Sequence, residues 1–217
     1  FQNEDLRQAV SYALDYEAFK TYFGSPYAQI PNRGFVPETT VGYHETQQLT
    51  TDTAKAAEYM AAAGYTEKNA EGFYVDGAGK TAAFTLTVNA AKEAHVGYAE
   101  LVKNQLEAFG IQVNLDPVDK DSYNAKTSNK FSENNITMEA AIYGYTAAGM
   151  GMGNGLGSIY VDGSHPVQGG CQVFDEAFQE ILAQMKGAKT MEEYYAAAAK
   201  LQDYYGAHVP LIALYWD

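Results

Sequence analysis

The stretch AAIYGYTAAGMGMGNGLGSIYV, residues 140–161, offers chemistry through its main chain, because it holds six glycines and no charged residue. Backbone amides of glycine-rich segments can cradle phosphate groups. A P-loop also needs Lys and Ser/Thr directly after its last glycine, but Met150 and Gly151 follow Gly149. The dinucleotide spacing G-x-G-x-x-G is absent too. The pattern therefore argues against a nucleotide site.

The same 22 residues would be long enough to cross a bilayer. Only Ile142, Leu156, Ile159 and Val161 are strongly apolar aliphatic residues, which is too few for a stable membrane helix. Two interpretations remain. The segment is either a surface loop or tight crossing, or it is the wall of a binding site. In the second case its backbone and the flanking tyrosines would contact a ligand (Tyr143, Tyr145, Tyr160).

Residues typical of catalysis and metal binding are scattered. No histidine has a partner at metal-ligand spacing, so surface positions are the simpler prediction for all four (His44, His95, His165, His208). Cys171 has no nearby base, and no G-x-S-x-G elbow occurs. We therefore predict no enzyme activity, no metal site and no cofactor.

Composition describes a folded, acidic protein with many tyrosines. In 217 residues, 47% are hydrophobic, 19% are charged, and the net charge is −13. This charge excludes a nucleic-acid partner, because phosphate neutralisation needs clustered Lys and Arg. Eighteen tyrosines suit recognition of varied ligands. Six tyrosines on predicted helices are better assigned to the core or its edge (Tyr59, Tyr98, Tyr194, Tyr195, Tyr204, Tyr205).

The elements that must position these residues alternate between helix and strand. Apolar spacing predicts helices over 3–22, 53–64, 98–109, 119–130, 174–185 and 190–205. Asn3 is the predicted cap of the first, Asp52 or Thr51 that of the second, and Thr190 with Glu193 forms a capping box for the last. Alternation and turn residues predict a hairpin of 72–80 with 81–90, and strands over 111–118, 136–145 and 209–216. Residues 25–50 form a long Pro- and Gly-rich connection. We predict one α/β (mixed α+β) domain over 1–217, with a mixed sheet flanked by about five helices.

Several stretches, taken in order, resemble family 5 extracellular solute-binding proteins, the peptide- and nickel-type receptors of ABC transporters. They are DLRQAVSYALDYEAF, the connector GSPYAQIPNRGFVPETTVGY, DTAKAAEYMAAAGY, GFYVDGAGKTAAFTLTV, LVKNQLEAFGIQVNLDPVDKDSY and VPLIALYW. Together they cover nearly all of the chain.

This resemblance implies a lobe of the periplasmic-binding-protein type II kind, excised from a two-lobed receptor. The other lobe would precede Phe1 and resume after Asp217, and the two lobes would close as a clamp over ligand. The implied partners are a peptide or other small solute, the missing lobe and an ABC permease. The implied location is extracytoplasmic, in the periplasm or on a cell-surface lipoprotein.

The resemblance also gives the glycine stretch a role. The family has Gly-Trp-x-x-Asp here, whose backbone binds an extended peptide and whose Asp pairs with the peptide's amino group. The aligned residues run from Gly144 to Ala148, so alanine replaces the aspartate. We predict six ligand-binding residues: Tyr143, Gly144, Tyr145, Thr146, Ala148 and Asn154. Without the carboxylate, the alternatives to a peptide are a neutral ligand such as an oligosaccharide, or a structural or interaction domain with no ligand of its own.

Overall fold

A computed structural model describes residues 3–127, 138–144 and 175–217, which fold as helices around two small sheets. The helices in this part of the chain are α1 (Glu4–Ala13), α2 (Tyr16–Phe23), α3 (Thr53–Ala62), α4 (Glu93–Phe109), α5 (Lys120–Thr127), α8 (Glu176–Gly187) and α9 (Met191–His208). The strands are β1 (Tyr65–Lys68), β2 (Tyr74–Asp76), β3 (Ala83–Asn89), β4 (Gln112–Val118) and β5 (Ala140–Ala141). The predicted mixture of helix and strand is confirmed, with seven described helices instead of about five.

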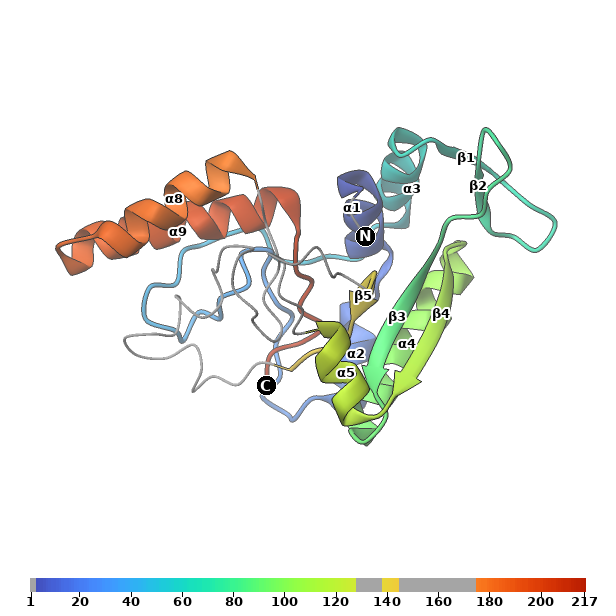
Figure 1. Cartoon of the computed structure of the whole chain (residues 1–217), viewed down its shortest axis with the longest axis horizontal. Coiled ribbons are helices and arrows are strands. Elements are labelled where there is room, and N and C mark those ends of the chain that lie inside the picture. The colour runs from blue at the N-terminus through green and yellow to red at the C-terminus, as the bar shows by residue number, and fades with distance from the viewer. Residues whose placement is uncertain (1–2, 128–137, 145–174) are drawn as a thin grey trace.

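The three-stranded sheet is the frame of the molecule. Its order is β4-β3-β5 and all its strands are parallel, with Leu86 of β3 beside Leu115 on one side and Ala140 on the other. The alternation predicted for β3 is confirmed, because Phe84, Leu86 and Val88 belong to the core. Helix α4 packs behind β3 and β4 in Figure 1. The carboxyl ends of the three strands therefore meet at one edge of the sheet.

The first predicted helix is wrong in its length, because the chain breaks it into α1 and α2. Leu14 and Asp15 have extended backbone angles (ψ 139° and 97°). The Asp15 carboxylate then accepts a hydrogen bond from the Ala18 N–H at 3.1 Å, which starts a new helix. The cap predicted at Asn3 is confirmed by its hydrogen bond from the Leu6 N–H at 3.2 Å.

The predicted hairpin of 72–80 with 81–90 is also wrong in its pairing. Strand β2 pairs antiparallel with β1, which was not predicted, and touches the approach to β3 only through a bridge between Val75 and Thr81. Strand β3 is buried from Thr87 to Asn89 and needs a neighbour on each side. Those neighbours are β4 and β5, which come from later in the sequence.

The strand predicted over 209–216 does not form. Val209 takes a left-handed conformation (φ 44°) at the end of α9, and Pro210 has no N–H for a ladder. A single antiparallel bridge joins Trp216 to Gln29 in the connector, with hydrogen bonds of 2.9 and 3.0 Å. The predicted capping box of Thr190 and Glu193 is confirmed.

Three predicted elements extend into parts of the chain that are not described. The helix predicted over 174–185 is α8 (Glu176–Gly187), and residue 174 lies outside the described ranges. Strand β5 covers only Ala140–Ala141 of the strand predicted over 136–145, and residues 136, 137 and 145 lie outside the described ranges. Helix α5 ends at Thr127, and the predicted remainder to 130 lies outside them as well.

The described residues contain two hydrophobic cores. One lies between α1–α4 and the sheet, and the other joins α8 and α9 to Phe35, Val36 and Ala213. The α8–α9 pair extends to one side of the molecule, and the β1–β2 hairpin lies at the opposite end (Figure 1). The two cores therefore form a long molecule with a junction near α1.

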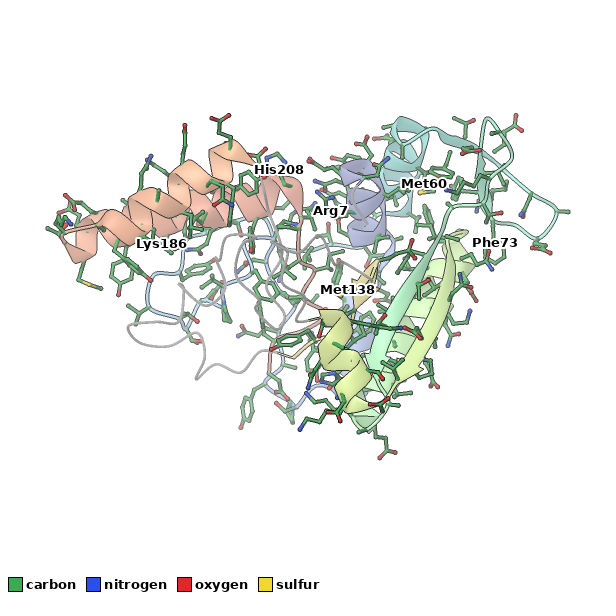
Figure 2. The ribbon with its side chains drawn as sticks, viewed as in Figure 1. Arg7, Met60, Phe73, Met138, Lys186 and His208 are labelled. Carbon is green, nitrogen blue, oxygen red and sulfur yellow. The ribbon has the colours of Figure 1, made fainter. Side chains whose placement is uncertain are left out.

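Arg33, only 4% exposed, stands at this junction. Its Nε donates to the Gly206 carbonyl at 3.1 Å, and its guanidinium lies 4.6 Å from the Tyr12 ring centre. Arg7 of α1 donates to the His208 carbonyl at 3.2 Å, and Arg7 and His208 lie close together in Figure 2. Side chains from α1 and the connector thus cap the C-terminus of α9.

Candidate functional site

Of the six residues predicted to bind ligand, the structure describes Tyr143 and Gly144. Both are exposed, and both follow β5 directly at the carboxyl edge of the sheet. Tyr145, Thr146, Ala148 and Asn154 lie outside the described residues. In open α/β sheets, ligands bind in the crevice beyond the carboxyl ends of the strands. The described pair therefore stands where this rule expects a site.

Ile142, the residue before this pair, is held firmly inside the fold and is 7% exposed. Its N–H donates to the Thr87 carbonyl of β3 at 3.1 Å. Its carbonyl accepts a hydrogen bond from the Tyr123 hydroxyl of α5 at 2.5 Å. Burial raises the pKa of Tyr123 to about 12, with a smaller contribution from Tyr143. Tyr123 therefore remains a hydrogen-bond donor at neutral pH.

Beyond Ile142 the main chain turns outward. The Gly144 backbone groups make no hydrogen bond with any residue in the described ranges. The Tyr143 side chain is 37% exposed, and burial of its remainder raises the pKa of its hydroxyl. The pair thus offers an aromatic face beside main-chain donor and acceptor groups.

His95 lies beside Gly144, which the sequence did not reveal. It was predicted to be a surface histidine, yet it is half-buried in the first turn of α4, against the outgoing chain. A Cβ added at Gly144 would lie 3.3 Å from its Nε2 and 3.6 Å from its Cε1. Glycine at position 144 is what allows the imidazole and the main chain to approach this closely.

The turn between β3 and α4 explains why His95 lies at the sheet edge. The Asn89 side chain accepts a hydrogen bond from the Ala91 N–H, and its carbonyl accepts one from the Lys92 N–H, both at 3.0 Å. This short turn starts α4 immediately beyond the end of β3. The first turn of the helix is thereby placed beside Ile142 and Gly144.

Tyr98 lies beside the imidazole and belongs to a small aromatic cluster. The Tyr98 ring centre lies 5.8 Å from that of His95. Tyr98 in turn meets Phe23 of α2 edge-to-face at 4.7 Å, and its hydroxyl hydrogen-bonds the Tyr215 hydroxyl at 2.7 Å. Tyr98 was predicted to lie at the core edge, and its half-buried position confirms this.

The pKa of His95 is lowered, first by burial and then by the charge of Lys92 nearby. The nearby backbone of Ile142 opposes this lowering of the pKa in part. His95 is therefore neutral at pH 7, and a neutral imidazole carries one donor and one acceptor nitrogen. The described side of the site has no formal charge on the side chains of His95, Tyr123 or Tyr143.

Two hollows open elsewhere on the described surface. One, of about 450 Å³, lies on the sheet and is lined by Thr87, Asp116, Lys126 and Met138 among others. Two of its charges are paired, because Lys126 donates to Asp116 at 2.5 Å and thereby lowers the pKa of the Asp116 carboxyl. Glu139, which also lines this hollow, accepts a hydrogen bond from the Thr85 N–H at 2.6 Å. The other, of about 760 Å³, runs along the connector to Trp216. Neither hollow includes Tyr143 or Gly144.

The described ranges contain no group of three His, Cys, Asp or Glu side chains that could hold a metal ion. In the same ranges, no helix has the length and apolar character that crossing a membrane requires.

Comparison with solved structures shows a known fold. The oligopeptide-binding protein AppA of Bacillus subtilis, solved with a nonapeptide, matches 100% of this chain with a TM-score of 0.81 at 18% identity. The binding protein MelB of Agrobacterium fabrum C58, solved with stachyose, matches 99% with a TM-score of 0.79 at 19% identity. This chain covers 42% and 33% of those two chains, respectively. This chain therefore shares the fold of the matched part of these two binding proteins.

Residues 1–162 match the family model "Bacterial extracellular solute-binding proteins, family 5 Middle". The chain therefore belongs to family 5 of the bacterial extracellular solute-binding proteins, which confirms the predicted family and its binding-protein fold.

Two curated relatives match shorter parts. A "Probable ABC transporter-binding protein" of Deinococcus radiodurans is 29% identical over 97 residues, 43% of this chain and 16% of the relative. The oligopeptide-binding protein AppA of B. subtilis is 26% identical over 124 residues, 55% of this chain and 22% of the relative. The matched regions thus span less than a quarter of either relative.

Proposed function

We propose that residues 1–217 form one lobe of a two-lobed receptor that captures a solute outside the cytoplasm and delivers it to an ABC permease. The solute is a peptide, held between this lobe and the other by clamp closure. The receptor resides in the periplasm or on the cell surface as a lipoprotein. The chain binds its ligand and does not transform it.

The observation that carries this proposal is the outward main chain at Tyr143 and Gly144. An extended peptide that lies along a strand end hydrogen-bonds through its own main chain, so such a site tolerates many side chains. Gly144 supplies backbone groups that no described residue occupies. Tyr143 adds a partly exposed ring. The predicted residues Tyr145, Thr146, Ala148 and Asn154 would continue this wall.

A second candidate ligand is a neutral oligosaccharide, and one residue favours it. Alanine stands at position 148, where the resembling family carries the aspartate that pairs with a peptide's amino group. A buried ammonium group without a carboxylate partner is costly. Among proteins of this fold, B. subtilis AppA was solved with a nonapeptide and A. fabrum MelB with stachyose. A blocked or long peptide, whose amino group does not enter the site, also agrees with Ala148.

Thermal unfolding of the complete receptor distinguishes these ligands. Free peptides, N-acetylated peptides and oligosaccharides would each be added, and a ligand at about 100 times its Kd stabilises by about 2.7 kcal/mol. We expect stabilisation by peptides. Stabilisation by sugars alone would identify the ligand as an oligosaccharide, the second candidate. If no ligand of the three classes stabilises the receptor, peptides and oligosaccharides are both excluded as its solutes.

The site itself is tested with Tyr143→Ala, and Tyr27→Ala is the matched control because Tyr27 is 87% exposed away from the sheet edge. We expect Tyr143→Ala to weaken binding of the stabilising ligand about tenfold, whereas Tyr27→Ala leaves the Kd unchanged. Equal affinities of the two variants would exclude Tyr143 from the site.

A further inference from the structure

The larger of the two hollows is a groove with aromatic walls, which follows the connector between α2 and α3. Its volume is about 760 Å³. The half-buried side chains of Ile30, Tyr43 and Trp216 belong to its lining and also pack against the hydrophobic cores. The Trp216 ring meets Phe35 edge-to-face at 5.3 Å. One part of each aromatic side chain is thus fixed in the fold, and the other part faces the groove.

The loop that forms this groove is anchored to the rest of the molecule. Two antiparallel hydrogen bonds, of 2.8 and 2.9 Å, join the two arms of the loop over 31–49. Gln202 of α9, which is fully buried, bonds the backbone on both sides of Tyr43. Its side chain accepts from the His44 N–H at 2.8 Å and donates to the Gly42 carbonyl at 2.7 Å. Helix α9 therefore holds Tyr43 in place, and the groove exists before any ligand arrives.

Carboxylates outnumber cations along the groove. Three glutamates and one lysine are among its described lining residues, which gives a formal charge of −2. Glu17 and Lys20 pair with each other at 2.8 Å. Glu38 and Glu45 are exposed, and neither has an ion pair or a hydrogen bond within the described ranges. Burial raises the pKa of the Tyr43 hydroxyl, and the nearby charges of Glu38 and Glu45 raise it further.

This combination of side chains suits a positively charged group. An ammonium or guanidinium group over the face of a Trp or Tyr ring is attracted by the π electrons. A carboxylate beside the ring adds a charge-assisted hydrogen bond. Lys20 is the one cation among the described lining residues, and its charge is already neutralised by Glu17.

We propose that this groove is a second subsite of the lobe, which receives a positively charged group of the peptide ligand against Tyr43 and Trp216, with Glu38 and Glu45 as counter-charges. The inference rests on the proposed function. The charged group belongs either to the amino terminus of the peptide or to a Lys or Arg side chain. The stretch over 140–161 has no charged residue, so the groove supplies a counter-charge that this stretch lacks.

Trp216 is the only tryptophan of the chain, so its fluorescence reports on the groove directly. The first probe is the peptide Ala-Ala-Lys-Ala-Ala, blocked at both ends and titrated into the 217-residue chain. The second probe is pentaalanine with a free amino terminus and a blocked carboxyl terminus. Their neutral controls are the first peptide with acetyl-lysine and the second with an acetylated amino terminus. We expect a saturable change with at least one cationic probe, and binding of its neutral control that is weaker by about tenfold or more.

The double variant Glu38→Gln with Glu45→Gln removes both carboxylates at nearly constant side-chain size. We expect the Kd of the cationic probe to rise about tenfold, because two exposed ion pairs are lost. The matched control is Glu58→Gln with Glu67→Gln. It changes the net charge by the same amount at exposed positions outside the groove lining, and it should bind like the wild type.

Four results would overturn the inference: no fluorescence change with either cationic probe at millimolar concentrations, equal affinity for a cationic probe and its neutral control, unchanged affinity in the groove double variant, or equal losses in the two double variants. The proposed site fails separately, through Tyr143→Ala in the complete receptor. If Tyr143→Ala leaves binding intact while the groove titrations give the expected result, the sheet-edge site is wrong and the groove subsite stands.

Discussion

At the scale of single residues, the Ile142 carbonyl anchors the main chain that leads to the proposed site. Tyr123 is 5% exposed and donates its hydroxyl to the Ile142 carbonyl, two residues before Gly144. A buried hydrogen bond of this kind contributes on the order of 1 kcal/mol. Its larger effect is geometric, because it fixes the start of the exposed main chain.

Tyr123→Phe should lower stability by about 1 kcal/mol at pH 8, since the Ile142 carbonyl loses one donor. The pH dependence has a definite sign. Burial raises the pKa of Tyr123 to about 12 in the folded state, against 10.0 for an unperturbed tyrosine. The contribution of the protonated hydroxyl is therefore complete below pH 10 and is lost as the pH rises toward 12.

Denaturant unfolding of the wild type and Tyr123→Phe, measured from pH 8 to pH 11.5, checks this prediction. The difference in unfolding free energy should shrink above pH 10, because only the wild type has the titrating hydroxyl at this position. A difference that stays constant across the range would mean that Tyr123 ionises equally easily in both states.

Part of the proposed site is visible in the sequence, and the reason is local. Tyr143 and Gly144 were found because an uncharged, glycine-rich stretch with tyrosines is visible along the chain. His95 and Tyr123 were missed as partners of this stretch because they precede it by 49 and 20 residues, counted to Gly144 and Tyr143. Only the parallel pairing of β3 with β5 brings α4 and α5 to Ile142. No spacing rule encodes that pairing.

At the scale of elements, β4 is an edge strand of the described sheet. The backbone groups on its outer side are protected from pairing with another strand. Gln112 donates to Ala82, and alternate residues of a parallel strand face alternate sides, so the Val113 backbone points outward. Lys103 of α4 donates to the Val113 carbonyl at 2.9 Å, and Glu107 accepts from its N–H at 3.3 Å. Farther along the same side, Pro117 has no N–H.

Replacing Glu107 and Pro117 should let two copies of the chain pair through β4. The double variant Glu107→Val with Pro117→Val frees the Val113 N–H and restores one at position 117. We expect it to self-associate in a concentration-dependent way, which sedimentation velocity would detect. Unprotected edge strands are templates for pairing with another chain.

Glu100→Val is the matched control, since Glu100 is an exposed carboxylate on the same helix but makes no contact with the Val113 backbone. It should remain as monomeric as the wild type. A double variant that also stays monomeric would show that α4 shields the edge sterically, without need of Glu107 and Pro117.

Helices were predicted best where the capping residues and the helix belong to one short segment of the sequence. The caps at Asn3 and Asp52 and the capping box at Thr190 all appear as expected. The errors concern competition between segments. Asp15 was predicted to lie inside a helix, although its carboxylate caps the next helix, α2. Strand β2 was predicted to pair with β3, which follows it in sequence, but it pairs with β1, which precedes it.

At the scale of the whole molecule, polar contacts join two separate cores. Arg33 donates to the Gly206 carbonyl at 3.1 Å and to Ser11 at 3.3 Å, and Gln8 donates to the Ala207 carbonyl at 2.6 Å. These bonds bring the first helix to the end of the last one. The sequence does not predict this contact, because arginine and glutamine are usually surface residues, whereas Arg33 and Gln8 are buried here.

The proposed binding role depends on the exposed main chain at Gly144, and amide hydrogen exchange at that residue measures whether a ligand binds there. The complete receptor would be measured with and without a saturating ligand chosen by thermal stabilisation. If the ligand adds along the strand end, the Gly144 N–H becomes a hydrogen-bond donor to it, and its exchange should slow by about tenfold or more. The Gly64 amide, already bonded to Ala61 at 3.0 Å, serves as the reference that should not change. Unchanged exchange at Gly144 in a receptor that is demonstrably saturated would contradict the account.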